Sequence, residues 1–300
     1  MLALAAPLVL LAACTDPPPA GPPATVPAVP VTATPYDIVI RPIGSIDPAQ
    51  LAVFETAAQR WERTITADVP DVPVSGFTGC TEQAPPVSLI DDLVIDVQIV
   101  YIDGAGGVLG QAGPCATSTA DGLPRAGTMR FDSADVARWM NDGGFQNVVL
   151  HEMAHVLGYG TKWGAQANPP RAALLAGSGG SDPRFIGLRA VAEWQALSGE
   201  STAVPVEADY GGGTAYAHWD DETFGTELLT GMIGLGASPL SRLSIASLGD
   251  LGYQVDLSQA DPYTLPSALI GPALRAFGTD LHGDDPATDG MALVVPTISF

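Results

Sequence analysis

Residues 148–158 read VVLHEMAHVLG. Apolar residues surround the histidines of this stretch and predict a buried helix that ends at Gly158, because glycine is a natural helix stop. His151 and His155 are four residues apart, so on a helix both imidazoles can reach one metal ion. Glu152 is turned by about 100° from His151, which places its carboxylate beside that ion rather than on it. The pattern H-E-x-x-H therefore predicts zinc, with Glu152 as the general base for water.

A third zinc ligand must come from another segment. A catalytic zinc usually has three protein ligands and one open position. Glu193 lies in a second predicted helix and would complete a set of two histidines and one glutamate. His218 and His282 are the other downstream histidines. The spacing of these residues leaves the choice between the three candidates open.

The flanking sequence predicts an α+β fold. Apolar residues at helical spacing follow the capping pair Asp47–Pro48 and recur over 186–197 and 241–252. Apolar and polar residues alternate over 93–102, which predicts a half-buried strand, and 127–132 is a second expected strand. Stretches rich in Pro and Gly are expected to be loops, over residues 66–86 and 104–113.

The composition restricts the partners. Asp and Glu number 33 against 12 Lys and Arg, which gives a formal net charge of -21 at pH 7. Such an acidic chain repels phosphate groups, so we expect it to bind neither nucleic acid nor, by charge alone, an anionic membrane. Hydrophobic residues make up 46% of the sequence, which is enough for a sizeable core.

The N-terminal segment predicts export and lipid anchoring. Residues 1–13 form an apolar run that is too short to span a bilayer and is typical of a signal peptide. The stretch LAAC at 11–14 resembles the lipobox of bacterial lipoproteins, in which the cysteine carries the lipid. Residues 14–36 are rich in proline and would form an extended tether. We expect anchoring through Cys14 in the bacterial cell envelope, on the outer side of a membrane, or secretion if Cys14 is not lipidated.

The two remaining cysteines are expected to form one disulfide. Cys80 and Cys115 are left once Cys14 carries the lipid, and two cysteines of an exported chain pair most simply with each other. Closing a loop of about 35 residues would stabilise the fold by a few kcal/mol.

The sequence around the histidine motif resembles the leishmanolysin family of zinc metallopeptidases. The residues that carry the resemblance are GGGT at 211–214, HW at 218–219, FG at 224–225 and ELLTG at 227–231. In that family a long insertion separates the helix from the third zinc ligand, which implies His218 for that ligand here. The family's methionine turn beneath the zinc falls at Leu229, with Met232 three residues further on, and the sequence leaves open which of them serves it.

The resemblance also implies an architecture. It is a metzincin-like zinc peptidase domain over residues 37–265, with a small mixed sheet, an active-site helix and a loop-rich C-terminal subdomain. Substrate would lie extended along an edge strand above the zinc, and we expect 127–132 to be that strand. Residues 266–300 follow as a tail without an assigned role.

These observations predict a zinc endopeptidase that acts on protein or peptide substrates. One Zn²⁺ per chain would be held by His151, His155 and His218, and Glu152 would pass a proton from water to the leaving amine. Two other functions stay open: a surface lipoprotein that keeps the fold as a binding module, and a zinc hydrolase that acts on non-peptide substrates. The intact motif favours the peptidase.

Overall fold

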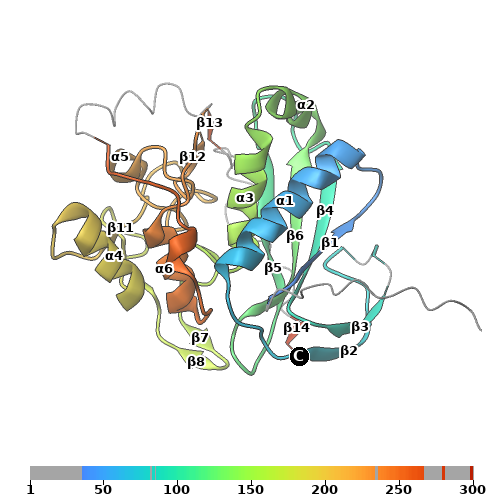
Figure 1. Cartoon of the computed structure of the whole chain (residues 1–300), viewed down its shortest axis with the longest axis horizontal. Helices are drawn as coiled ribbons and strands as arrows, with labels where there is room; N and C mark the ends of the chain where they lie inside the picture. The colour runs from blue at the N-terminus through green and yellow to red at the C-terminus, as the bar shows by residue number, and fades with distance from the viewer. Residues whose placement is uncertain are drawn as a thin grey trace, which may run out of the picture. The chain divides into compact units, whose positions relative to one another are not determined.

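The computed structural model describes most of the chain after residue 35 (Figure 1). The described residues are 36–81, 83–84, 86–233, 236–266, 279–280 and 298–299. All of them belong to the compact unit Ala33–Phe300. The predicted signal peptide, the lipid site at Cys14 and the tether up to residue 35 lie outside the described residues.

A five-stranded mixed sheet forms the centre of this unit. Its strand order is β1 (Ile38–Pro42), β4 (Leu93–Val100), β6 (Pro124–Asp132), β5 (Gly110–Thr117) and β14 (Ile298–Ser299). The first three strands are mutually parallel, β5 is antiparallel to β6, and β14 is parallel to β5. The small mixed sheet expected from the sequence is therefore present.

The strand predicted over 127–132 is not at an edge. It is the second half of β6, which pairs with β4 on one side and β5 on the other. The expectation that substrate lies along 127–132 is therefore wrong, because its backbone groups are already used in the sheet. The strand nearer the edge is β5, whose only partner beyond β6 among the described residues is β14, at Ala116 and Thr117.

Two helices pack on one face of the sheet, α1 (Pro48–Thr64) and α3 (Phe145–Val156) (Figure 1). Helix α1 begins as the sequence predicts: the Asp47 carboxylate accepts the Ala49 N–H at 2.8 Å, and Gln50 completes a capping box. Three aromatic rings join α1, β6 and α3, with centroids 5.3–5.9 Å apart; they are Phe54, Phe131 and Phe145. The rings fix α3 against the sheet. Helix α2 (Ser133–Asn141) follows β6 directly.

The opposite face of the sheet is covered by a hairpin that the sequence did not predict. Strands β2 (Val72–Phe77) and β3 (Val87–Ile90) form it, and β2 lies inside the stretch expected to be a loop. Phe77 and Ile90 pack with Val94 of β4 in a second apolar cluster. Strand β4 is therefore buried on both faces over its first five residues and is not half-buried as its alternation predicts.

A single polar side chain is buried within this region of β4. Asp96 accepts a hydrogen bond from Arg41 Nε at 2.9 Å and is fully buried. The neighbouring disulfide between Cys80 and Cys115 ties the end of the hairpin to β5. The predicted disulfide is thus confirmed.

The remaining residues form a loop-rich half with short strands and three helices. The helices are α4 (Leu188–Ser198), α5 (Asp221–Phe224) and α6 (Arg242–Leu251), with the 3-10 turn η1 (Leu257–Gln259). The strands are β7 (Gln166–Ala167), β8 (Pro170–Arg171), β9 (Leu175–Ala176), β10 (Arg184–Phe185), β11 (Val204–Pro205), β12 (Met232–Ile233) and β13 (Thr279–Asp280). Helices α4 and α6 pack against each other, as their predicted apolar faces require. In the described part of the chain, no helix has the length and apolar character needed to cross a membrane.

Candidate metal centre

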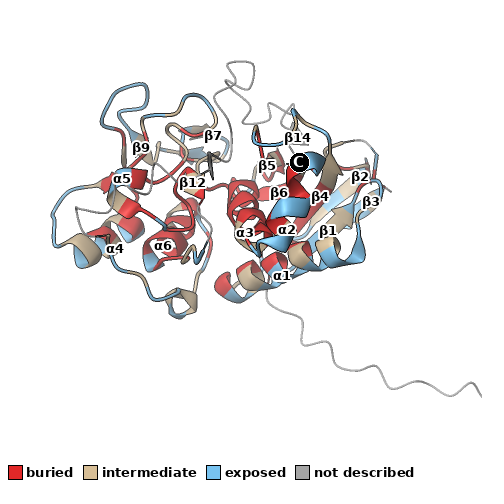
Figure 2. Cartoon of the chain, turned by 90° about the horizontal axis from the view of Figure 1, so that it is seen from above, coloured by how far each residue is buried: buried red, intermediate tan, exposed pale blue. Residues whose placement is uncertain are grey.

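The helix that carries the histidine motif lies deep in the protein. Every residue of α3 from Val148 to Val156 is buried, and Figure 2 shows this helix almost entirely in the colour of buried residues. The chain leaves the helix at Gly158, whose φ of 107° lies in the region that favours glycine. Gly160 also has a positive φ, and a Cβ there would lie 2.4 Å from the Ala217 carbonyl oxygen. This close approach brings the end of α3 against the segment that carries His218.

Three histidines from two distant segments meet at this point. The Nε2 atom of His155 lies 3.1 Å from that of His151 and 3.0 Å from that of His218, and the third side of the triangle measures 3.1 Å. All three side chains are buried, with at most 3% of their surface exposed. A zinc ion with Zn–N distances of about 2.0–2.1 Å would separate three tetrahedral nitrogens by about 3.3–3.4 Å. The triangle fits such an ion closely.

Backbone carbonyl groups orient all three imidazoles. The Nδ1 atom of His151 lies 2.7 Å from the Leu228 oxygen, and that of His155 lies 3.0 Å from the Tyr159 oxygen. The Nδ1 atom of His218 lies 2.9 Å from the Thr214 oxygen. Since a carbonyl oxygen only accepts, each Nδ1 carries the proton and each Nε2 presents a lone pair.

A cation bound between the three rings would stabilise this arrangement. Three lone pairs that face one another at hydrogen-bond distance repel, and protonating the rings would bury positive charge. Burial lowers the pKa of His155 to about 4, so its ring is neutral at pH 7. Neutral imidazoles with converging Nε2 atoms and Nδ1 atoms held by the backbone are the ligands that zinc prefers.

Glu152 follows His151 directly on α3 and has no hydrogen-bond partner in the described part of the chain. Its carboxylate is fully buried, and neither oxygen accepts a hydrogen bond. Burial raises the pKa of Glu152 to about 8, and a nearby divalent cation would lower that pKa by stabilising the carboxylate. A Cβ built on Gly110 of β5 would lie 2.9 Å from Glu152 Oε1, so the backbone of β5 runs directly past the carboxylate. This position suits a general base that takes a proton from a molecule bound between α3 and β5.

The segment of His218 is held by its neighbours on both sides. The Glu207 N–H donates to the His218 carbonyl oxygen at 2.9 Å. The Trp219 N–H donates to the Leu229 carbonyl oxygen at 3.1 Å, and that oxygen also accepts the Tyr159 hydroxyl at 3.0 Å. These contacts join His218 to the end of α3 and to the turn at 227–231.

Leu229 lies in that turn, whose residues from 227 to 231 are all buried. Its side chain is fully buried, and the adjacent Leu228 supplies the carbonyl group that orients His151. Met232 is half-buried and lies on β12, which pairs with β13. Leu229 is therefore the more deeply buried of the two residues, and its carbonyl group bonds to Trp219, next to His218.

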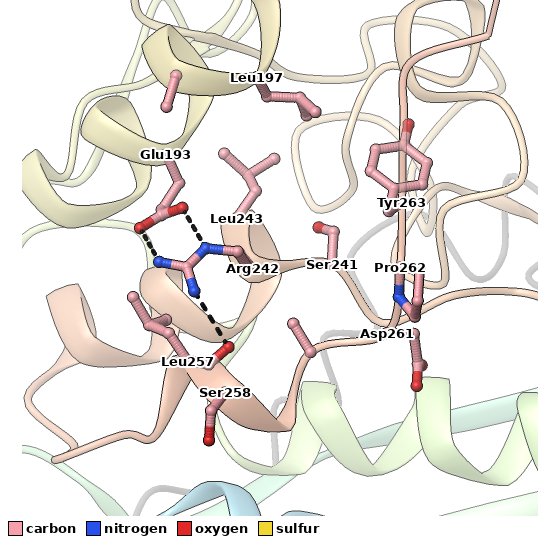
Figure 3. A pocket seen from close by; sticks show the side chains of 12 residues that line it. Glu193, Leu197, Ser241, Arg242, Leu243, Leu257, Ser258, Asp261, Pro262 and Tyr263 are labelled. Carbon is pink, nitrogen blue, oxygen red and sulfur yellow. Dashed lines mark hydrogen bonds and ion pairs between the residues drawn. The ribbon is translucent and has the colours of Figure 1, made fainter.

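The rival ligand Glu193 lies elsewhere. Glu193 and Arg242 line the pocket shown in Figure 3. Arg242 Nε donates to Glu193 Oε2 at 2.8 Å, and Arg242 Nη2 donates to Glu193 Oε1 at 2.9 Å. A guanidinium that binds a carboxylate through two parallel hydrogen bonds leaves it unsuited to a metal. His282, the other candidate, lies outside the described residues.

Gly110 and Tyr159 shape this centre, and the sequence did not indicate either of them. Gly110 lies in a stretch expected to be a loop, and only its pairing in β5 brings it to Glu152. Tyr159 follows the motif directly, but nothing in its spacing indicates the bond to Leu229. For Gly110 the useful signal was a glycine in a strand, which often marks a close approach of another group.

The family model described as leishmanolysin, a peptidase family, matches residues 80–268. The matched range contains all three histidines, Glu152 and both cysteines of the disulfide. The comparison with curated proteins finds no match.

Proposed function

Because the chain belongs to the leishmanolysin family of metallopeptidases, we propose that it is a zinc-dependent endopeptidase with one zinc ion per chain. His151, His155 and His218 would hold the ion, and Glu152 would serve as the general base. The observation that carries the proposal is the triangle of three Nε2 atoms at 3.0–3.1 Å, each on a ring whose Nδ1 faces a carbonyl group.

The reaction requires one metal ion and one base. Zinc held by the three histidines would supply a Lewis acid that polarises the peptide carbonyl and makes water more acidic. Glu152 accepts the proton of the attacking water and then donates it to the leaving amine, which breaks the peptide bond. Its buried, unpartnered oxygens suit this role, because no internal hydrogen bond must be broken before the proton moves.

Strand β5 offers the backbone groups along which a peptide substrate would lie. Within the described ranges, Gly110–Pro114 pairs with β6 on one side and with no strand on the other. An extended peptide could add to this edge through main-chain hydrogen bonds. Since Gly110 packs against Glu152, a peptide on the edge of β5 would pass the base and the three histidines.

The location of the protein remains a proposal from the sequence. Cys14 would carry a lipid after removal of residues 1–13 and would hold the peptidase at the outer side of a bacterial membrane. The proline-rich segment would keep the catalytic unit away from the bilayer.

A casein digest tests the proposed activity. The zinc-loaded protein should cleave casein, a chelator should stop cleavage, and added zinc should restore it. Glu152→Gln should lower the cleavage rate about 10²- to 10⁴-fold while zinc stays bound, because Glu152 is a base and not a ligand.

The same experiment separates the alternative functions. Zinc binding without cleavage of casein or gelatin would favour a binding module that keeps the fold. Zinc-dependent hydrolysis of ester or amide substrates without peptide cleavage would favour a non-peptide hydrolase. Cleavage that persists after the zinc has been removed would refute the zinc peptidase.

A further inference from the structure

Glu227 is a buried glutamate that the proposed reaction does not use. It lies in the turn 227–231, whose Leu228 carbonyl group contacts His151. The Glu227 side chain is 1% exposed. It accepts hydrogen bonds from the Leu229 N–H at 2.6 Å, the Ser241 N–H at 3.0 Å and the Ser244 hydroxyl at 2.5 Å. All three contacts are donors, so they stabilise the ionised carboxylate.

The first of these bonds shapes the turn that orients His151. Glu227 Oε2 holds the Leu229 N–H, which folds residues 227–230 back on themselves. In this conformation the Leu228 carbonyl oxygen meets His151 Nδ1 at 2.7 Å. The same conformation directs the Leu229 carbonyl toward the Trp219 N–H, next to His218.

A second route connects Glu227 to the segment of His218. The Trp219 indole N–H donates to the Ser244 hydroxyl oxygen at 2.8 Å, and that hydroxyl donates to Glu227 Oε1. Glu227 is therefore connected to two of the three histidines. It holds the turn whose Leu228 carbonyl orients His151, and through Ser244 it reaches Trp219, the residue after His218.

Among the described residues, no cationic side chain offsets the charge of Glu227: no arginine, lysine or histidine forms an ion pair with this carboxylate. Burial raises the pKa of Glu227 above its ordinary value, and the hydrogen-bond donors offset only part of that rise. A buried carboxylate without a counter-charge is costly. A divalent cation on the nearby histidines would reduce that cost.

We propose that Glu227 is a positioning residue of the metal centre: its carboxylate fixes the turn whose carbonyl groups hold His151 and the segment of His218, and its charge favours the metal-loaded state. The inference rests on the proposed zinc site, but not on peptide cleavage. Glu227 touches neither substrate nor metal in this account.

Zinc affinity of Glu227→Gln tests the inference, by competition with a chromophoric chelator. Glutamine keeps the size of the side chain but removes the charge and one acceptor. We expect zinc to bind about 10- to 100-fold more weakly, as is usual when a group that supports metal ligands is lost. Without zinc, the variant should unfold at nearly the same temperature as wild type. Zinc should raise the Tm of the variant less than that of wild type, because the variant binds zinc more weakly. The cobalt-substituted protein should show a shifted visible absorption spectrum.

Asp250→Asn is the matched control. Asp250 accepts two backbone N–H groups, from Arg189 and Ala190, and lies in the α4–α6 contact away from the histidines. This variant should bind zinc as wild type does. If Glu227→Gln does not fold, Ser244→Ala gives a second reading, because it removes one donor to Glu227 and the partner of Trp219, and it should weaken zinc binding in the same direction.

The results separate positioning from a structural role. Unchanged zinc affinity in Glu227→Gln would overturn the inference. Equal losses of stability in the zinc-free and zinc-loaded forms would overturn it as well, since they indicate a structural role alone. Wild type that binds zinc but cleaves no peptide would refute the proposed function and leave the affinity test of Glu227 intact.

Discussion

Replacing Gly110 by alanine tests how closely β5 approaches the proposed base. A Cβ at this position would lie 2.9 Å from Glu152 Oε1 and 3.1 Å from Phe131 Cε1. The Phe131 ring is packed against Phe145 at a centroid distance of 5.3 Å and cannot retreat easily. The carboxylate of Glu152 must therefore move.

The size of the effect follows from these distances. Ordinary contacts of a carbon atom begin at about 3.4–3.5 Å, so the Glu152 carboxylate must shift by at least about 0.5 Å. A misplacement of about 1 Å at a reacting group can lower a rate about 10²-fold. We expect Gly110→Ala to lower kcat for casein about 10- to 100-fold. Zinc content should stay the same, because the atoms nearest to the new methyl group belong to Glu152 and Phe131 and not to a histidine.

Gly164→Ala provides the control outside β5. A Cβ there has no atom within 4 Å, so the methyl group fits without displacement. Peptide cleavage and zinc content are measured on both variants. Full activity of Gly110→Ala would refute the contact between β5 and Glu152, and loss of zinc from it would show that the change acts on the ligands instead.

Three further variants test other parts of the account. Replacing both Cys80 and Cys115 by serine should lower the free energy of unfolding by about 4 kcal/mol, because their 35-residue loop is no longer closed; equal urea midpoints under non-reducing conditions would contradict this. Tyr159→Phe removes the hydroxyl bond to Leu229 and should cost about 1 kcal/mol in urea unfolding, with weaker zinc binding; an unchanged midpoint would show that the bond contributes nothing. Cys14→Ser should move the protein from the membrane to the soluble fraction, and a variant that still sediments with membranes would exclude the lipid anchor.

The motif helix was predictable because its signals are local. The periodicity of apolar residues and the spacing of His151 and His155 act within one helix, and Gly158 marks its end. The same holds for the helix that begins after Asp47, whose capping pair acts over one turn.

Strands β2 and β5 were missed because their sequences carry no alternation. β2 reads VPVSGF and β5 reads GQAGPCAT, so proline and glycine in both indicate loops. Tertiary pairing overrides that local preference: β5 forms a long ladder with β6, and β2 covers the second face of β4. The edge position of β5 follows from this pairing and could not be read from sequence periodicity.

The approach of His218 to the motif depends on contacts between distant segments. Its ring is oriented by Thr214, its backbone is held by Glu207, and the next residue bonds to Leu229. No pattern of sequence spacing predicts these long-range bonds. The sequence therefore indicated His218 only through its resemblance to a family. The ion pair between Glu193 and Arg242 could not be predicted from the sequence either, because it forms only when α4 and α6 pack together.

The zinc content of three purified proteins tests the central claim most directly. Wild type, His218→Ala and Glu193→Gln are dialysed against the same limiting zinc and measured by elemental analysis. We expect one zinc per chain in wild type and in Glu193→Gln, and a large loss in His218→Ala, because two histidines of one helix do not complete the site. Zinc retained by His218→Ala and released by Glu193→Gln would contradict the site described above.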